Sequence, residues 1–204
     1  MTLKNVKTSL NKIAKDLGDI QDAREFLLKN TREAIILCSK SIIAVHKEDL
    51  VTGKKNLKQA KTLLKKYKKK ATGGLERYLI TPEQEFVEAA CLIAIVEKKE
   101  IPSDKKLSVM PESYVLGLLD CVGELKRQVF DKIRMNNIDE ATRIFEVMEN
   151  LYLQLYTFSI YDKVVKEARR KTDVNRILVD DVRSVITEER RRTELIRILQ
   201  KLEK

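Results

Sequence analysis

Residues 82–96 have the sequence Pro-Glu-Gln-Glu-Phe-Val-Glu-Ala-Ala-Cys-Leu-Ile-Ala-Ile-Val. Residues 114–125 have the sequence Tyr-Val-Leu-Gly-Leu-Leu-Asp-Cys-Val-Gly-Glu-Leu. Apart from their acidic residues, both stretches have the apolar content of buried helices. They therefore predict an all-α protein whose core is formed around these two helices.

Two pairs of carboxylates interrupt these apolar stretches. Glu85 and Glu88 are three residues apart, and Asp120 and Glu124 are four apart, so each pair lies on one face of its helix. Leu92 continues the first face, which is therefore expected to turn inward. The connection between the helices is short enough to make them antiparallel neighbours. We therefore expect the two carboxylate faces to converge.

A buried ionised carboxylate is costly unless a cation or a hydrogen-bond network compensates it. One interpretation is structural: each carboxylate pairs with a lysine, an arginine or the backbone. The other is a metal site with Glu85, Glu88, Asp120 and Glu124 as oxygen ligands, whose mutual repulsion raises their pKa values when no metal is bound.

The residue types narrow the choice of metal. Di-iron bundles use Glu-x-x-His pairs, and this chain has one histidine, His46. Oxygen-only ligation favours Mg²⁺ or Mn²⁺, whose usual chemistry is phosphoryl transfer or phosphodiester hydrolysis. We interpret His46 as a helix-end residue, because no serine or cysteine partner indicates a nucleophilic triad.

The whole chain, residues 1–204, is interpreted as a single domain of about seven helices. Glycine (6) and proline (3) are scarce, and aromatic residues make up only 5%. Start signals are expected at Thr81, as a capping box with Pro82, at Pro111 and at Asn137. The expected helices cover residues 2–20, 21–48, 53–71, 82–99, 111–135, 137–158 and 173–203.

Composition also bears on location. No apolar run reaches the roughly 18 residues of a transmembrane helix, and the N-terminus lacks the apolar core of a signal peptide. The three cysteines are far apart and lie in apolar contexts, which indicates buried thiols rather than disulfides or a zinc site. An intracellular, cytoplasmic protein without a membrane anchor is predicted.

The net charge of +10 is concentrated in one segment. Nine lysines and no acidic residue lie between Lys54 and Lys70. A charge run is usually a solvated face, but this one favours a polyanion, with nucleic acid bound through its phosphates. Large apolar anchors for a membrane are missing. The predicted contacts are Lys61, Lys65, Lys66, Lys69 and Lys70, with Lys126 and Arg127 beside the second carboxylate pair.

Three segments resemble the translin family. Residues 32–47 resemble its first long helix, Glu85-Phe-Val-Glu-Ala89 its Glu-Tyr-Val-Glu-Ala motif, and residues 114–125 its Tyr-Leu-Leu-Gly-x-x-Asp-x-x-Gly-Glu-Leu motif. The likeness covers roughly residues 20–160. The acidic cluster resembles that of the translin-associated factor X branch, and the compact chain fits a self-assembling version of the kind found in archaea.

The resemblance implies a seven-helix protomer in a closed, hollow octamer. It further implies a Mg²⁺-dependent endoribonuclease, with Glu85, Glu88 and Asp120 at the catalytic positions and Glu124 at a further acidic position. The alternative is a translin-type oligomer that binds RNA or single-stranded DNA without cleaving it. A helical scaffold for protein partners is a third class, although interior carboxylates argue against both non-catalytic classes.

Overall fold

The computed structural model describes residues 3–202, and every regular element in that range is helical. In chain order the elements are α1 (Lys4–His46), α2 (Leu50–Lys68), the 3₁₀ turn η1 (Glu76–Leu79), α3 (Ile80–Val96), α4 (Asp104–Leu107), α5 (Pro111–Arg134), α6 (Ile138–Tyr156), the 3₁₀ turn η2 (Thr157–Tyr161) and α7 (Ala168–Leu202). The expectation of an all-α fold with about seven helices is confirmed. No described helix is long and apolar enough to span a bilayer.

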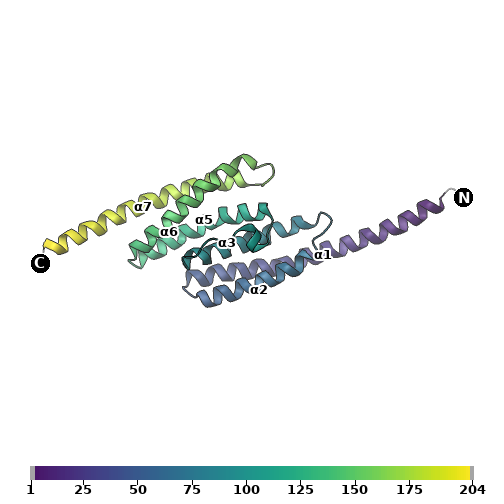
Figure 1. Ribbon diagram of the computed structural model, residues 1–204, viewed down its shortest axis with the longest axis horizontal. Coiled ribbons are helices and arrows are strands. Elements are labelled where there is room, and N and C mark those ends of the chain that lie inside the picture. Colours follow the sequence, from purple (N-terminus) through teal and green to yellow (C-terminus); the bar gives the residue numbers. More distant parts are fainter. Residues whose placement is uncertain (1–2, 203–204) are drawn as a thin grey trace.

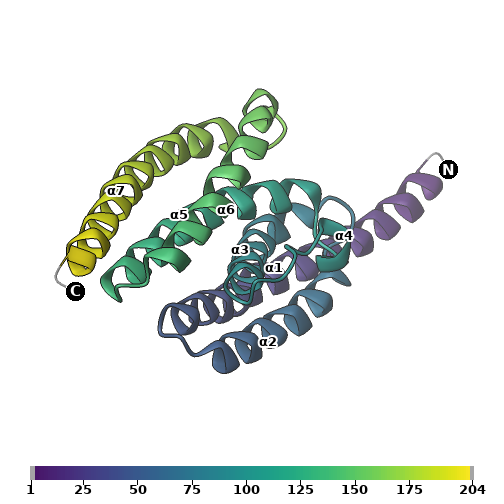
Figure 2. The same cartoon turned by 60° about the vertical axis from the view of Figure 1, so that its left-hand side comes forward.

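Helix α3 is the centre of the bundle. It packs against α1, α2 and α5, and twelve of its 17 residues are buried. Helices α6 and α7 pack against α5 and against each other, on the side away from α1 and α2 (Figures 1 and 2). The first part of α1 and the last part of α7 project from opposite ends of the molecule (Figure 1).

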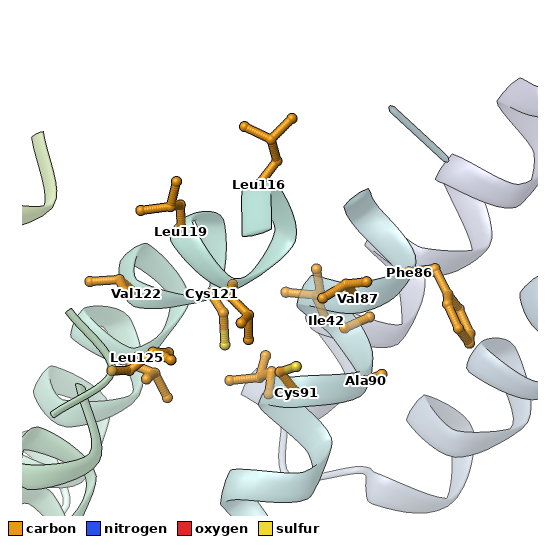
Figure 3. Close-up of a cluster of buried hydrophobic side chains, with 14 of the residues drawn as sticks. Ile42, Phe86, Val87, Ala90, Cys91, Leu116, Leu119, Cys121, Val122 and Leu125 are labelled. Atoms are coloured by element: carbon orange, nitrogen blue, oxygen red, sulfur yellow. The ribbon is translucent and has the colours of Figure 1, made fainter. Parts of the chain in front are cut away.

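The tightest approach between α3 and α5 is at Gly117. A methyl group there would lie 2.5 Å from the Gln84 carbonyl oxygen and 2.6 Å from Cβ of Val87, so only glycine fits. Cys91 of α3 and Cys121 of α5 point into the same apolar contact just beyond this crossing (Figure 3). The glycine therefore sets the close packing of the two helices that carry the carboxylates.

Two of the three predicted start signals are confirmed. Pro111 occupies the first turn of α5, and the Asn137 side chain accepts a hydrogen bond from the Glu140 amide at 3.2 Å. The Thr81 capping box is wrong. Because η1 leads directly into α3, the helix begins at Ile80 and Thr81 lies inside its first turn.

Predicted boundaries also differ at the two ends of the chain. The helices expected over residues 2–20 and 21–48 form one helix, α1, since Gly18 costs only about 1 kcal/mol relative to alanine and no proline interrupts the segment. Helix α7 begins at Ala168, five residues before the expected start. Residues 2 and 203, included in the predicted helices, lie outside the described range.

The projecting part of α1 carries an uncovered apolar stripe. Its members are between 48 and 71% exposed and recur every three or four residues: Leu3, which precedes the first helical residue, and Val6, Leu10, Ile13 and Leu17. Helical spacing of this kind fits packing against another helix. Within the described protomer nothing covers the stripe, so the predicted self-association keeps its physical basis.

Candidate functional site

The four predicted carboxylates line one cleft of about 430 Å³. Glu85 and Glu88 come from α3, and Asp120 and Glu124 come from α5, together with Arg127. The remaining wall is α1, through Ser39, Ile42 and Ile43. The helical spacings thus produce the convergence that the sequence predicts.

Glu85 and Glu88 have no direct hydrogen-bonding or ion-pair partner among the described residues, and Lys171 only partly offsets their raised pKa values. Within residues 3–202 neither carboxylate forms an ion pair or a side-chain hydrogen bond. Burial raises the pKa of Glu88 to about 9, with further contributions from Asp120, Glu85 and Glu124. The pKa of Glu85 is also raised, first by burial and then by Asp120. Burial and mutual repulsion therefore disfavour the ionised forms of both carboxyl groups, and a bound cation would favour ionisation.

Asp120 differs from this pair because it is compensated. The Lys171 ammonium from α7 donates to Oδ1, and the Gln84 amide donates to Oδ2 at 2.5 Å. Of the two interpretations left open by the sequence, the pairing of Asp120 with a lysine fits the structural one. Sequence spacing gave no sign of Lys171 as a partner, because α7 is far from α5 along the chain.

Glu124 is compensated by the only histidine of the chain. His46 Nε2 lies 2.5 Å from Glu124 Oε2, and the other ring nitrogen, Nδ1, faces Gln128 and Asp131 of α5. His46 is the last residue of α1, as predicted, but its side chain is buried against the carboxylate site rather than solvated. The sequence interpretation missed this contact.

The cleft has the donor chemistry of a Mg²⁺ or Mn²⁺ site. Its acidic groups offer only oxygen atoms, and two of them are partly buried without partners. However, among residues 3–202 no three histidine, cysteine, aspartate or glutamate side chains are gathered into a ready-made metal-binding group. Glu85 and Glu88 fit as primary ligands, while Asp120 would have to exchange its lysine partner for the cation.

The basic tract lies apart from the cleft. It forms α2, which packs against α1 and α3, and no α2 residue lines the cleft. Lys61 of α2 is half-buried, and the other predicted contacts of the tract are exposed: Lys65 and Lys66 on α2, and Lys69 and Lys70 just after it. Lys68 instead lies 2.8 Å from the fully buried Glu83, so one lysine of the tract has a structural role.

The two predicted basic residues of α5 have different surroundings. Arg127 lines the cleft beside the carboxylates. Lys126 pairs with Asp181 of α7 at 2.5 Å, and its ammonium lies 5.4 Å from the Phe130 ring centre. Only Arg127 is therefore placed to contact a ligand in the cleft.

Further cations lie on the α7 side of Asp120. One hollow of about 180 Å³ is lined by Asp120, Arg170 and Lys171, and another of about 330 Å³ by Lys171, Lys166 and Arg77. Cationic side chains therefore lie on both sides of the acidic cleft, but Lys171 pairs with Asp120, Arg170 pairs with Glu167 at 2.6 Å, and Glu112 and Glu167 also line the second hollow. The basic run at residues 169–171 is the part of the sequence that could have indicated the cations of α7.

Comparison with known proteins places these features in a family. The model of the translin family matches residues 2–186. An uncharacterized protein of Methanocaldococcus jannaschii is 38% identical over 174 residues, which are 84% of this chain and 78% of that protein.

Solved structures agree with the family match. AfC3PO in complex with duplex RNA is 31% identical, with a TM-score of 0.80 over 88% of this chain and 95% of that one. A second structure, the crystal structure of AfC3PO, is 32% identical, with a TM-score of 0.81 over 88% of this chain and 96% of that one. The apo form of NeC3PO is similar in fold, with 22% identity and a TM-score of 0.76 over 87% and 95%.

Proposed function

This chain belongs to the translin family, and on that premise we propose that it binds RNA and cleaves it with the help of a divalent cation, Mg²⁺ or Mn²⁺. In this proposal Glu85, Glu88 and Asp120 are the catalytic carboxylates, and Glu124 is a further ligand. The protein is then a metal-dependent endoribonuclease of the translin-associated factor X type.

The observation that carries the proposal is the pair Glu85 and Glu88. Both carboxylates border a cleft and lack any partner among the described residues, although burial and the neighbouring acids raise their pKa values. A protein that only binds a polyanion gains nothing from acids in such a position, because they repel the phosphates. A bound divalent cation removes this conflict.

The chain's own residues would bind and orient the substrate. Arg127 on one side, and Lys171 with Arg170 on the other, are placed to receive phosphates next to the carboxylates. The wall of the cleft contributed by α1 is apolar, through Ile42 and Ile43. When bound, the cation would activate a water molecule for attack on the phosphodiester and offset charge that develops on the phosphate.

Support for RNA as the ligand comes from two directions. AfC3PO, which shares the fold and 31% of the aligned residues, has been solved with duplex RNA. In this chain the exposed lysines of α2 supply point charges suited to phosphates, and the few aromatic residues disfavour base stacking. We therefore expect binding that depends on salt and hardly on base sequence, to single strands or short duplexes, including single-stranded DNA.

We further propose that the protomers assemble into a homo-oligomer. The uncovered stripe on α1 and the exposed apolar residues near the end of α7, Leu195, Ile198 and Leu202, require a partner helix. The family resemblance implies a closed octamer with the clefts facing inside. Light scattering would give eight times the protomer mass, and a monomer at micromolar concentration would contradict the assembly.

A second candidate function is RNA or single-stranded DNA binding without cleavage. One observation favours it: Asp120 and Glu124 are already paired with Lys171 and His46, so no complete set of free ligands is present. The two candidates differ in their response to metal. Cleavage requires the cation, whereas phosphate binding by lysines does not.

The deciding experiment measures cleavage of single-stranded and short duplex RNA in Mg²⁺, in Mn²⁺ and in EDTA. Wild type is compared with Glu85→Gln and with Glu100→Gln, a control that removes an exposed carboxylate outside the cleft. We expect metal-dependent cleavage that Glu85→Gln abolishes and Glu100→Gln retains. RNA that is bound but never cut would leave the non-catalytic function as the correct one.

A further inference from the structure

We propose that His46 is a positioning residue of the carboxylate site, which acts by holding Glu124 in a fixed orientation toward the cleft. This inference rests on the proposed function, because it assigns Glu124 as a metal ligand. It goes beyond that function by giving a role to a residue on a different helix, outside the acidic motifs. His46 does not line the cleft and is not expected to touch RNA.

The contacts of the imidazole ring are specific. Its side chain is 3% exposed, and all its polar partners lie on one face of α5, at Glu124, Gln128 and Asp131. These positions are spaced i, i+4 and i+7, so the ring spans two turns of that helix. A residue that merely ended α1 would need none of these polar contacts.

The contacts also place a ring hydrogen. The Gln128 amide nitrogen, which can only donate, lies 3.0 Å from Nδ1, whereas the Asp131 carboxylate is farther away, at 3.5 Å, and forms no hydrogen bond with the ring, so Nδ1 accepts from Gln128. The hydrogen on the ring then belongs to Nε2, which donates to Glu124 Oε2 at 2.5 Å. Hydrogen bonds are therefore donated from Gln128 to His46 and from His46 to Glu124.

This arrangement leaves one carboxylate oxygen for a ligand. Oε2 of Glu124 is engaged by the ring, whereas Oε1 has no hydrogen bond among the described residues, and Glu124 borders the cleft. Without the ring, the carboxylate is free to rotate away from Glu88 and Glu85, to which it is electrostatically coupled. Partners behind a ligand commonly change metal affinity 10–100-fold when they are removed.

Two substitutions separate a donor role from a packing role. In His46→Gln an amide nitrogen can occupy the region of Nε2 and still donate to Glu124. In His46→Asn the shorter side chain can reach only the region of Nδ1. Both variants are polar and both lose the ring, so they form a matched pair that differs in the hydrogen bond to Glu124.

The readout is the dissociation constant for Mn²⁺, followed by electron paramagnetic resonance of the free ion, with melting temperature as the control for folding. We expect His46→Asn to weaken Mn²⁺ binding about 10–100-fold and His46→Gln to remain close to wild type. In a Glu124→Gln background, His46→Asn should cause no further loss, because the histidine acts through Glu124.

Three results would overturn the inference. The two variants could lose affinity equally, which indicates packing alone. His46→Asn could weaken binding to the same extent with and without Glu124, which indicates another route. Wild type could bind Mn²⁺ while His46→Asn matches it. If instead wild type binds no Mn²⁺, the proposed function itself fails, and this inference fails with it.

A measurement on the unmodified protein covers the case in which a variant does not fold. Because the chain has one histidine, protein labelled with ¹⁵N-histidine has one imidazole ring. We expect a hydrogen on Nε2, and ring nitrogen signals that move when Mg²⁺ is added. A ring with its only hydrogen on Nδ1 would contradict the proposal.

Discussion

Replacing Glu88 by glutamine should stabilise the metal-free protein at neutral pH. The Glu88 side chain is 8% exposed, has no partner among the described residues, and faces three other carboxylates across the cleft. Burial and these neighbours raise its pKa from 4.5 to about 9. At pH 7 the folded protein therefore holds Glu88 protonated, whereas the unfolded chain ionises it.

The cost of this protonation follows from the pKa values. A carboxyl group with a raised folded pKa contributes full stability below pH 4.5, and this contribution falls as pH rises toward about 9. Between pH 4.5 and pH 7 the loss is on the order of 3 kcal/mol, at about 1.36 kcal/mol per pH unit. For a chain of this size, that corresponds to a melting temperature about 6–12 °C higher in Glu88→Gln.

The assay is thermal unfolding in EDTA from pH 5 to pH 9, at one protein concentration because the assembly state affects apparent stability. Wild type should lose stability across this range. Glu88→Gln should lose much less and retain a smaller slope from Glu85, whose pKa is raised in the same direction. With Mg²⁺ added, wild type should gain stability at pH 7, while the variant gains little.

A contrary result would be clear. If Glu88→Gln is less stable than wild type in EDTA at pH 7, Glu88 has a structural partner that the described contacts do not include. If both proteins have the same pH dependence, the carboxylates of the cleft are not coupled as the structure implies. Either outcome would remove the physical basis for a cation at this position.

Two other predictions follow from the fold and the charge. Gly117→Ala should destabilise the protein by about 1–3 kcal/mol or more, because the added methyl group collides with α3. Gly123→Ala, whose methyl group would have no neighbour within 4 Å, should be neutral or stabilising by up to about 1 kcal/mol. Chemical denaturation compares the two variants, and equal effects would contradict the close contact at Gly117. Changing four exposed lysines to glutamine should weaken RNA binding and lower the salt slope by up to roughly 0.9 per lost phosphate contact. The four lysines are Lys65, Lys66, Lys69 and Lys70. Filter binding across a salt series measures the affinity and its salt slope, and an unchanged affinity would indicate that the lysine tract is only a solvated face.

Local sequence patterns predicted much of the fold. The scarcity of glycine and proline indicated helices, Pro111 and Asn137 marked real helix starts, and the spacing of the acidic pairs placed them in one cleft. These features depend on residues close in sequence, whose relative positions a helix fixes. Thr81 failed as a start signal because the preceding 3₁₀ turn continues into α3 without a cap.

The partners of the acidic residues could not be predicted in the same way. His46 and Glu124 are 78 positions apart, and Asp120 and Lys171 are 51 apart. Such pairs depend on how α1 and α7 pack against α5, which no local period encodes. Lys68 shows the same limit, since its place in a basic run suggested solvent while the packing of α2 on α3 brings it to Glu83.

The central claim is that the cleft between α3 and α5 holds a divalent cation. The most direct test is an anomalous difference map from crystals of the protein soaked in Mn²⁺. The account predicts a peak within ligand distance of the Glu85 and Glu88 carboxylates, with the Asp120 side chain turned from Lys171 toward the ion. A map with no peak in this cleft would contradict the claim.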